Sequence, residues 1–244
     1  ESIRGTTATP LPPQLWGEST RHGSRLYLHV FHWPADGRLY LAGLKSAVVS
    51  ARVLGQPASL AVRRVNASDV EIRVPARAPD PWDAVVVLDC ASPIRADTAL
   101  YLPTHAAPVE LHVFNGWLVG RGIHYSDGKL GRDVVLGWKA TGSGIDWPVR
   151  LSAQGRFRVV ADFAPADSAS GGTLELSAGP AQITVPIAAA PPLKPATPYR
   201  SAELGVITLE AGRHTLALRA KDVAGTELMR LQQLRLIPTP AQEH

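Results

Sequence analysis

The stretch "TRHGSRLYLHVFHWPADG", from Thr20 to Gly37, has apolar or aromatic side chains at consecutive positions through its centre. Successive side chains of an extended strand point to opposite faces. One face of this strand carries Leu26, Leu28, Val30 and His32, and the other carries Tyr27, His29, Phe31 and Trp33. Both sets suit burial, so we predict a strand that is covered on both sides. Pro34 ends it, and "ADG" turns the chain into the next strand.

The histidines of this stretch do not suggest a metal site. His29 and His32 fall on opposite faces of the predicted strand, whereas a chelating pair on a strand needs i, i+2 spacing. The chain has no H-E-x-x-H motif, and its single cysteine, Cys90, excludes a cysteine-rich zinc site. Cys90 ends the apolar run "AVVVLDC", which indicates a buried structural thiol rather than a nucleophile. We therefore predict no metal and no cofactor.

Further strands follow at short intervals on the C-terminal side of this stretch. The candidates are "RLYLAGL", "SAVVSARVL", "ASLAVRRV", "DVEIRVP" and "AVVVLDC". Short strands separated by turn residues are typical of a compact antiparallel sandwich. The polar connector "ASPIRADT" lacks any periodicity, and we place a domain boundary within it, giving a first domain over residues 1–95.

The strand pattern restarts after the connector. Ten candidates follow: "TALYLP", "VELHVF", "DVVLGW", "DWPVRL", "GRFRVVADF", "GTLELSA", "AQITVPI", "ELGVITL", "RHTLALRA" and "LQQLRLI". This number of strands fits a jelly-roll sandwich over residues 96–244. The proline-rich "AAAPPLKPATPYR" suits an exposed loop. With no helix of three turns predicted, the fold class is all-β: two tandem antiparallel β-sandwiches, the second jelly-roll-like.

Composition narrows the function classes. The 244 residues carry a formal net charge of +4, and the arginines are scattered without a basic run, which argues against nucleic-acid binding. The sequence contains no run of eighteen apolar residues, so no membrane span is predicted. The chain begins with "ESIRGTT" and without an initiator Met, as a piece of a longer protein would.

Catalytic motifs are lacking, but candidate sugar-binding residues are present. The chain has no P-loop, no G-x-G-x-x-G after a strand and no G-x-S-x-G elbow. Aromatic rings can stack on the apolar faces of sugars, with polar side chains beside them for the hydroxyls. The candidates in predicted loops and strand ends are Tyr125, Trp138 and Tyr199, with Asp127, Arg200 and Lys139 as polar partners. The alternative is that these aromatics cap the core, where we also place Trp147.

Several motifs resemble a known family. "ESIRGT", "LWGESTRHGSRLYLHVFHWPADGRLYLAGL" and "VPARAPDPWDAVVVLD" resemble the region directly after the catalytic barrel in bacterial α-L-fucosidases of glycoside hydrolase family 29. The resemblance covers residues 1 to about 90, and it departs at His32, where the family usually carries Asp. "GRFRVVADF", "LGVITLEAGRHTLALRA" and "ELMRLQQLRLIP" are similar to jelly-roll carbohydrate-binding modules. Such modules often have a tryptophan where this chain has "PPLKPATPYRS".

The resemblance implies a non-catalytic C-terminal portion of an α-L-fucosidase, whose barrel and catalytic carboxylates would precede Glu1. The implied partners are that barrel and fucosylated or other glycans, and secretion or a periplasmic location would fit. We expect the first sandwich to expose an apolar or aromatic patch where the barrel docks, with Trp16, Trp33 and Trp82 as candidates. The alternative is a purely structural or assembly role without a glycan ligand.

Overall fold

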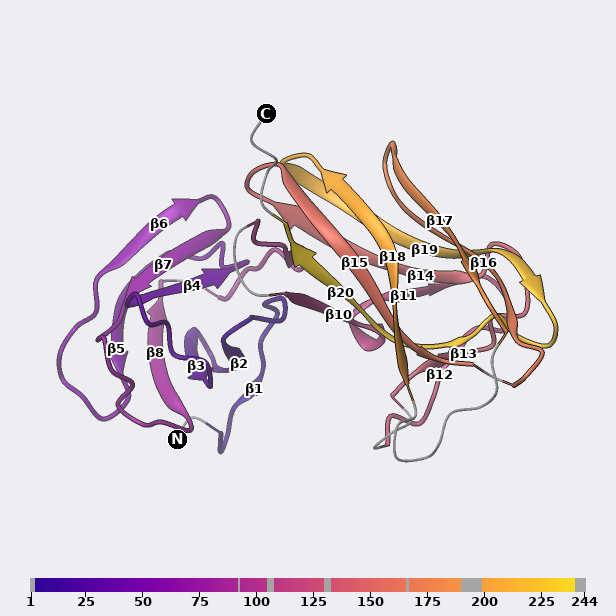
Figure 1. Cartoon of the computed structure of the whole chain (residues 1–244). Coiled ribbons are helices and arrows are strands. Elements are labelled where there is room, and N and C mark those ends of the chain that lie inside the picture. Colours follow the sequence, from indigo (N-terminus) through magenta and orange to yellow (C-terminus); the bar gives the residue numbers. More distant parts are fainter. Residues whose placement is uncertain are drawn as a thin grey trace. The chain divides into compact units, whose positions relative to one another are not determined.

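The computed structural model describes residues 3–91, 93–104, 108–129, 133–165, 167–189 and 199–239. The chain divides into two compact units, Glu1–Tyr101 and Leu102–His244 (Figure 1). Within the described residues, all regular structure is β-strand except one 3-10 helix, η1 (Val113–Asn115). Every strand pair whose register is described is antiparallel.

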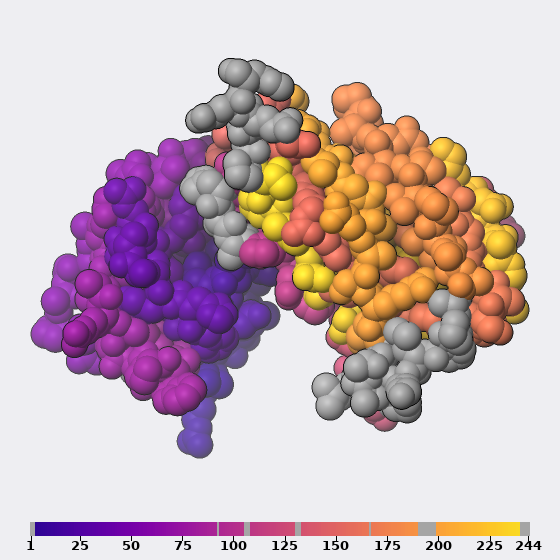
Figure 2. All heavy atoms as spheres, viewed as in Figure 1, coloured from indigo at the N-terminus to yellow at the C-terminus, as the bar shows by residue number. Residues whose placement is uncertain are grey.

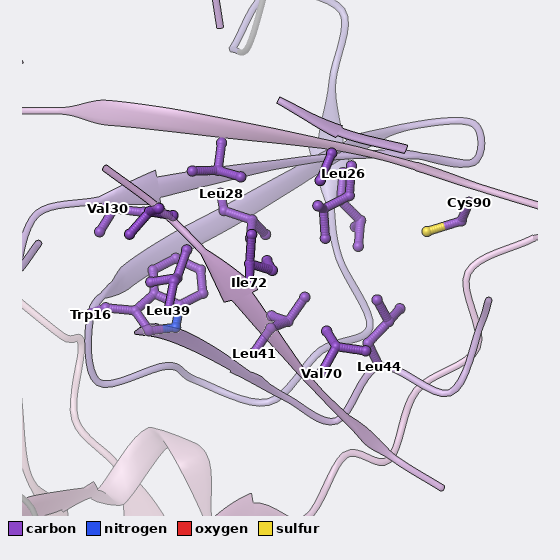
Figure 3. Packing of buried hydrophobic residues seen from close by; sticks show 14 residues of the cluster. Trp16, Leu26, Leu28, Val30, Leu39, Leu41, Leu44, Val70, Ile72 and Cys90 are labelled. Carbon is purple, nitrogen blue, oxygen red and sulfur yellow. The ribbon is translucent and has the colours of Figure 1, made fainter. Parts of the chain in front are cut away.

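The first unit contains a five-stranded and a three-stranded sheet. The larger sheet has the order β1 (Thr7–Ala8), β2 (Gly17–His22), β3 (Arg25–Val30), β8 (Ala84–Cys90) and β5 (Val48–Val53). The smaller sheet has the order β4 (Arg38–Ala42), β7 (Asp69–Arg73) and β6 (Val62–Asn66). Apolar side chains of both sheets form one buried cluster between them (Figure 3).

Strand β3 is buried on both faces, as its sequence predicted. Leu26, Leu28 and Val30 belong to the main cluster, while Tyr27 packs in a separate small cluster with Val85, Val87 and Leu54. The strand is shorter than predicted because it ends at Val30. The backbone N–H groups of the next two residues both donate to the carbonyl of Trp16, at 2.9 and 3.0 Å, which turns the chain before Pro34.

The connector around residue 95 packs within the first unit. Ala96 forms an isolated bridge with Leu44, and the backbone N–H of Asp97 donates to the carbonyl of Gly43 at 2.8 Å. The ring of Tyr101 stacks on that of Tyr40, with centroids 5.0 Å apart. These contacts lie within the first compact unit, Glu1–Tyr101.

Within the described residues, the second unit contains two sheets, to which it contributes six and five strands. One has the order β12 (His124–Tyr125), β13 (Val135–Leu136), β20 (Arg230–Pro238), β15 (Gly155–Ala164) and β18 (Arg200–Leu209), with β10 (Val109–His112) also paired to β20. The other has the order β11 (Trp117–Val119), β14 (Gly144–Leu151), β19 (Gly212–Ala224), β16 (Gly171–Ala178) and β17 (Ala181–Ile187). The short strand β9 (Leu100–Tyr101) is at the end of the first unit.

Period-2 alternation explains how these sheets enclose a core. On β15, the rings of Phe157 and Phe163 are buried, whereas Arg156 and Arg158 on the opposite face are partly exposed. Trp147 on β14 is buried, and its indole N–H donates to the carbonyl of His112 at 2.9 Å. The structure confirms the predicted all-β class. Most of the proline-rich segment, residues 190–198, lies outside the described residues.

Candidate functional site

Trp138 is a core residue and not a sugar platform. Its side chain has 0% exposure, and its indole N–H donates to the carbonyl of Val135 at 3.2 Å. Gly137 precedes it with φ +84°, a left-handed conformation that glycine adopts without strain and that redirects the chain after β13. A ring with no exposed face cannot stack on a ligand, so the structure corrects the prediction for Trp138.

Tyr125 lies in an exposed aromatic pair that sequence reasoning missed. Its ring packs against Phe114 of η1, with centroids 5.3 Å apart and planes tilted by 35°. The two side chains are 37% and 46% exposed. The Tyr125 hydroxyl donates to the carbonyl of Gly116 at 2.6 Å, which fixes the ring, and burial raises the pKa of the hydroxyl. Phe114 was missed because its run, "VELHVF", reads as a strand to its end.

Asp127 follows this pair in the chain. Gly128 turns the loop back with φ +67°, and a Cβ at that position would lie 3.7 Å from the Phe114 ring. The Asp127 carboxylate accepts the backbone N–H of Lys129 at 3.4 Å, and its other oxygen lies 3.9 Å from Lys129 Nζ. An exposed carboxylate and an exposed ammonium group therefore flank Gly128, the residue next to the Phe114 ring.

Tyr199 reaches the same end of the sandwich through Asp133. Ser126 and Val134 exchange hydrogen bonds, so residues 127 and 133 are opposite each other at the end of the β12–β13 hairpin. The Tyr199 hydroxyl donates to Asp133 Oδ1 at 3.1 Å, and burial together with this bond raises the pKa of Tyr199 to about 12. The loops that carry Tyr125, Asp127 and Tyr199 thus converge.

Asp133 is the centre of this convergence. Its second carboxylate oxygen accepts from Gln232 Nε2 on β20 at 2.8 Å. Burial alone would raise the pKa of Asp133, but the hydrogen bonds from Gln232 and Tyr199 outweigh it and lower the pKa. The carboxylate stays ionised and holds the two elements together.

Arg200 is committed to contacts within the unit. Its guanidinium carbon lies 4.7 Å from the centroid of the buried Phe163 ring, and Nη2 donates to the carbonyl of Ala188 at 2.9 Å. Lys139 is exposed, in the turn after Trp138. Of the predicted residues, Tyr125 and Asp127 belong to the β12–β13 hairpin, and Tyr199 bonds to Asp133 of the same hairpin. Arg200 follows Tyr199 directly, and Trp138 lies in the core.

In the first unit, the exposed aromatic residues differ in part from those predicted. Trp16 is buried, with its indole N–H on the carbonyl of Tyr40, and Trp33 is half-buried, so neither ring stands free. Trp82 is 85% exposed. It lies two residues before Ala84, which pairs with Val30, and so it lies at the same end of the sheet as the exposed Phe31. Exposed Leu15 precedes Trp16, whose carbonyl holds the Phe31 N–H.

Within the described residues, no group of three His, Cys, Asp or Glu side chains could hold a metal ion. His29 is buried with Nδ1 3.0 Å from Asp83 Oδ2, while His32 is exposed beyond the end of β3. Burial, followed by the charge of Asp89, raises the pKa of the Cys90 thiol to about 11. No described helix is long and apolar enough to cross a membrane.

Comparison with known proteins gives a structural similarity only. No family model matches the sequence, and no curated protein matches it significantly. The α-L-fucosidase from Vibrio sp. strain EJY3 is similar in structure over 98% of this chain, with 20% sequence identity and a TM-score of 0.58. This chain spans 43% of the length of that enzyme. At this sequence identity the similarity is one of fold alone, and the matched residues come from both units.

Carbohydrate-binding modules are among the other structures found. The family 35 module from Clostridium thermocellum is matched over 53% of this chain and 98% of its own length, with 17% identity and a TM-score of 0.41. A family 35 module from Cellvibrio japonicus is matched over 54% and 93%, with 16% identity and a TM-score of 0.41.

Proposed function

We propose that this chain is a non-catalytic C-terminal accessory region of a glycosidase of the α-L-fucosidase type, family 29, and that its second unit binds carbohydrate. The observation that carries the accessory role is the fold similarity to a fucosidase over 98% of this chain and only 43% of the enzyme. The specific sequence motifs around β3 and β8 support the same parentage.

The carbohydrate role rests on the Phe114–Tyr125 pair. A pyranose ring has an apolar C–H face that can cover an exposed aromatic plane, while its edge hydroxyls need donors and acceptors nearby. Asp127 and Lys129, on either side of Gly128, provide an exposed acceptor and an exposed donor. One stacked ring with two or three polar contacts supports a Kd of about 0.1–1 mM.

A glycan array followed by calorimetric titration tests this site. We expect Phe114→Ala and Asp127→Asn each to weaken binding of the best array ligand, with an unchanged melting temperature for Asp127→Asn. Val206→Ala, an exposed apolar residue on β18, is the matched control and should bind normally. Equal affinity in all four proteins would refute the site.

The first unit is proposed to support a catalytic barrel through its exposed Leu15, Phe31 and Trp82. Exposed aromatic residues gathered at one end of a sheet are typical of a surface that a partner covers. Reading the source gene upstream of Glu1 tests this directly. An in-frame barrel-coding sequence supports the proposal, and a stop codon immediately upstream refutes it.

A purely structural role is the second candidate, and one observation favours it. Tyr199, Arg200 and Trp138 are all held by contacts within the unit, as residues that maintain a fold would be. In that case no glycan binds, and substitutions at Phe114 and Asp127 change nothing but local packing. The same array and titration therefore separate the two candidates.

A further inference from the structure

A row of side chains crosses the outer face of the sheet β11-β14-β19-β16-β17. Residues directly opposite each other on neighbouring antiparallel strands have their side chains on the same face of the sheet. The strand pairing places one residue of each of the five strands in such a row. The row consists of Trp117, Asp146, Ala217, Ser177 and Gln182. The residues that alternate with them, such as Ile145 and Leu218, are fully buried in the core. The row therefore faces away from the core.

Trp117 is the one large apolar side chain of this row. It is 67% exposed at the sheet edge, on a strand of three residues. Its neighbours across the strands are polar or small, so it does not form the contiguous apolar patch that protein partners bury. A single aromatic plane surrounded by polar groups matches the surface of a sugar better than that of a protein.

The polar side chains next to Trp117, those of Asp146 and Arg219, are held in place before any ligand binds. Arg219 Nη2 lies 2.6 Å from Asp146 Oδ1, and Arg219 Nη1 donates to the carbonyls of Ile145 and Leu218 at 3.1 Å. The two side chains keep 23% and 21% exposure, enough to meet a ligand hydroxyl. Because these bonds already hold the guanidinium, ligand binding costs little side-chain entropy at this position.

The remaining row suits an extended, uncharged ligand. Ala217 and Ser177 have small side chains, so the middle of the row does not protrude. Exposed Gln182 on β17, whose side chain hydrogen-bonds to Glu175, places an amide at the far edge (β17 is orange in Figure 2). Lys221 pairs with Glu175 at 2.9 Å, so the opposite charges of these two side chains neutralise each other. Five strands at a spacing of about 4.8 Å give a row of about 19 Å, long enough for several pyranose rings.

We propose that this outer face binds a neutral, unbranched oligosaccharide along the row from Trp117 to Gln182. One ring stacks on Trp117, the Asp146–Arg219 pair bonds the hydroxyls of that ring or the next, and Gln182 contacts a distal ring. This face goes beyond the site at Phe114 and Tyr125 and does not require it.

The test is a calorimetric titration of the full chain with cello-, manno- and xylo-oligosaccharides of one to six units. We expect affinity for at least one series to rise with length. Trp117→Ala should weaken binding of the hexamer about tenfold or more and leave the melting temperature within about 2 °C. Trp117→Phe should restore part of the affinity, since it keeps an aromatic plane.

Gln182→Ala tests the direction of the row. It should weaken binding of the hexamer but not of the dimer, because only the longer ligand reaches β17 from Trp117. Val206→Ala, on the other sheet, is the matched control for an exposed apolar side chain. Phe114→Ala should leave this binding intact.

Two results would overturn the proposal: hexamer binding that is unchanged in Trp117→Ala, or no binding of any linear oligosaccharide. Binding lost in Phe114→Ala but kept in Trp117→Ala would refute the sheet face while supporting the proposed function. If no linear oligosaccharide binds, the proposed function is still tested by the glycan array, because its branched and fucosylated ligands probe the site at Phe114 and Tyr125.

Discussion

Replacing Trp138 by alanine should destabilise the second unit strongly. The side chain is fully buried and its N–H is bonded to Val135, so the change removes a large packed volume and one hydrogen bond. Tryptophan-to-alanine changes in cores cost about 3–5 kcal/mol. For a unit spanning Leu102–His244, a free-energy loss of this size lowers the melting temperature by roughly 10–20 °C.

Differential scanning calorimetry measures this effect, because two compact units can unfold in separate transitions. The transition of the second unit should move down and that of the first unit should stay. Trp138→Phe is the graded variant: it keeps an aromatic ring, loses the N–H and should cost less than half as much. Trp117→Ala is the matched control, since it removes the same side chain from an exposed position. A loss below about 1 kcal/mol in Trp138→Ala would show that Trp138 is not part of the core.

Three further outcomes are expected. The chain should not hydrolyse an aryl α-L-fucoside, since retaining glycosidases need two carboxylates about 5 Å apart in one site; turnover that disappears on mutating a carboxylate of this chain would contradict this. The chain should bind no zinc at His29 and His32, because one is buried on Asp83 and the other lies beyond the strand; one tightly bound equivalent, lost in His29→Ala, would be the opposing result. The Cys90 thiol, with its pKa raised to about 11, should react with Ellman's reagent at pH 8 only after denaturant is added, and immediate reaction in the native protein would count against its burial.

Alternation of apolar residues was sufficient to predict the long strands but not the short ones. β3 and β15 carry enough periodic side chains for their faces to be assigned from the sequence. β11 and β12 have three and two residues, too few to show a period, and they exist because β14 and β13 provide hydrogen-bond partners. Such edge pieces depend on tertiary pairing, which a local pattern does not contain.

The candidate site shows the same limit with two tryptophans. "NGWLV" and "LGWKA" both place a tryptophan directly after a glycine, yet Trp117 is 67% exposed and Trp138 is fully buried. Trp117 pairs with Asp146 on the outer face of a sheet edge, whereas Gly137 turns the chain so that the Trp138 ring enters the core. The sheet register decides which face a side chain occupies, and one residue of slip would reverse it.

Weak binding at these surfaces would be sufficient for the proposed role. A single site with a Kd of about 1 mM contributes roughly 4 kcal/mol, too little to retain a free module on a soluble sugar. When the same site is linked covalently to a catalytic domain, the linker sets the effective concentration of the ligand at the site. This concentration reaches the millimolar range for short connections, so a millimolar Kd is sufficient. Two weak surfaces on one unit, around Tyr125 and along the row from Trp117, would multiply this effect on a polymeric ligand that reaches both. A soluble monosaccharide would gain nothing, so the ratio of polymer to monomer affinity, rather than either affinity alone, measures whether both surfaces act.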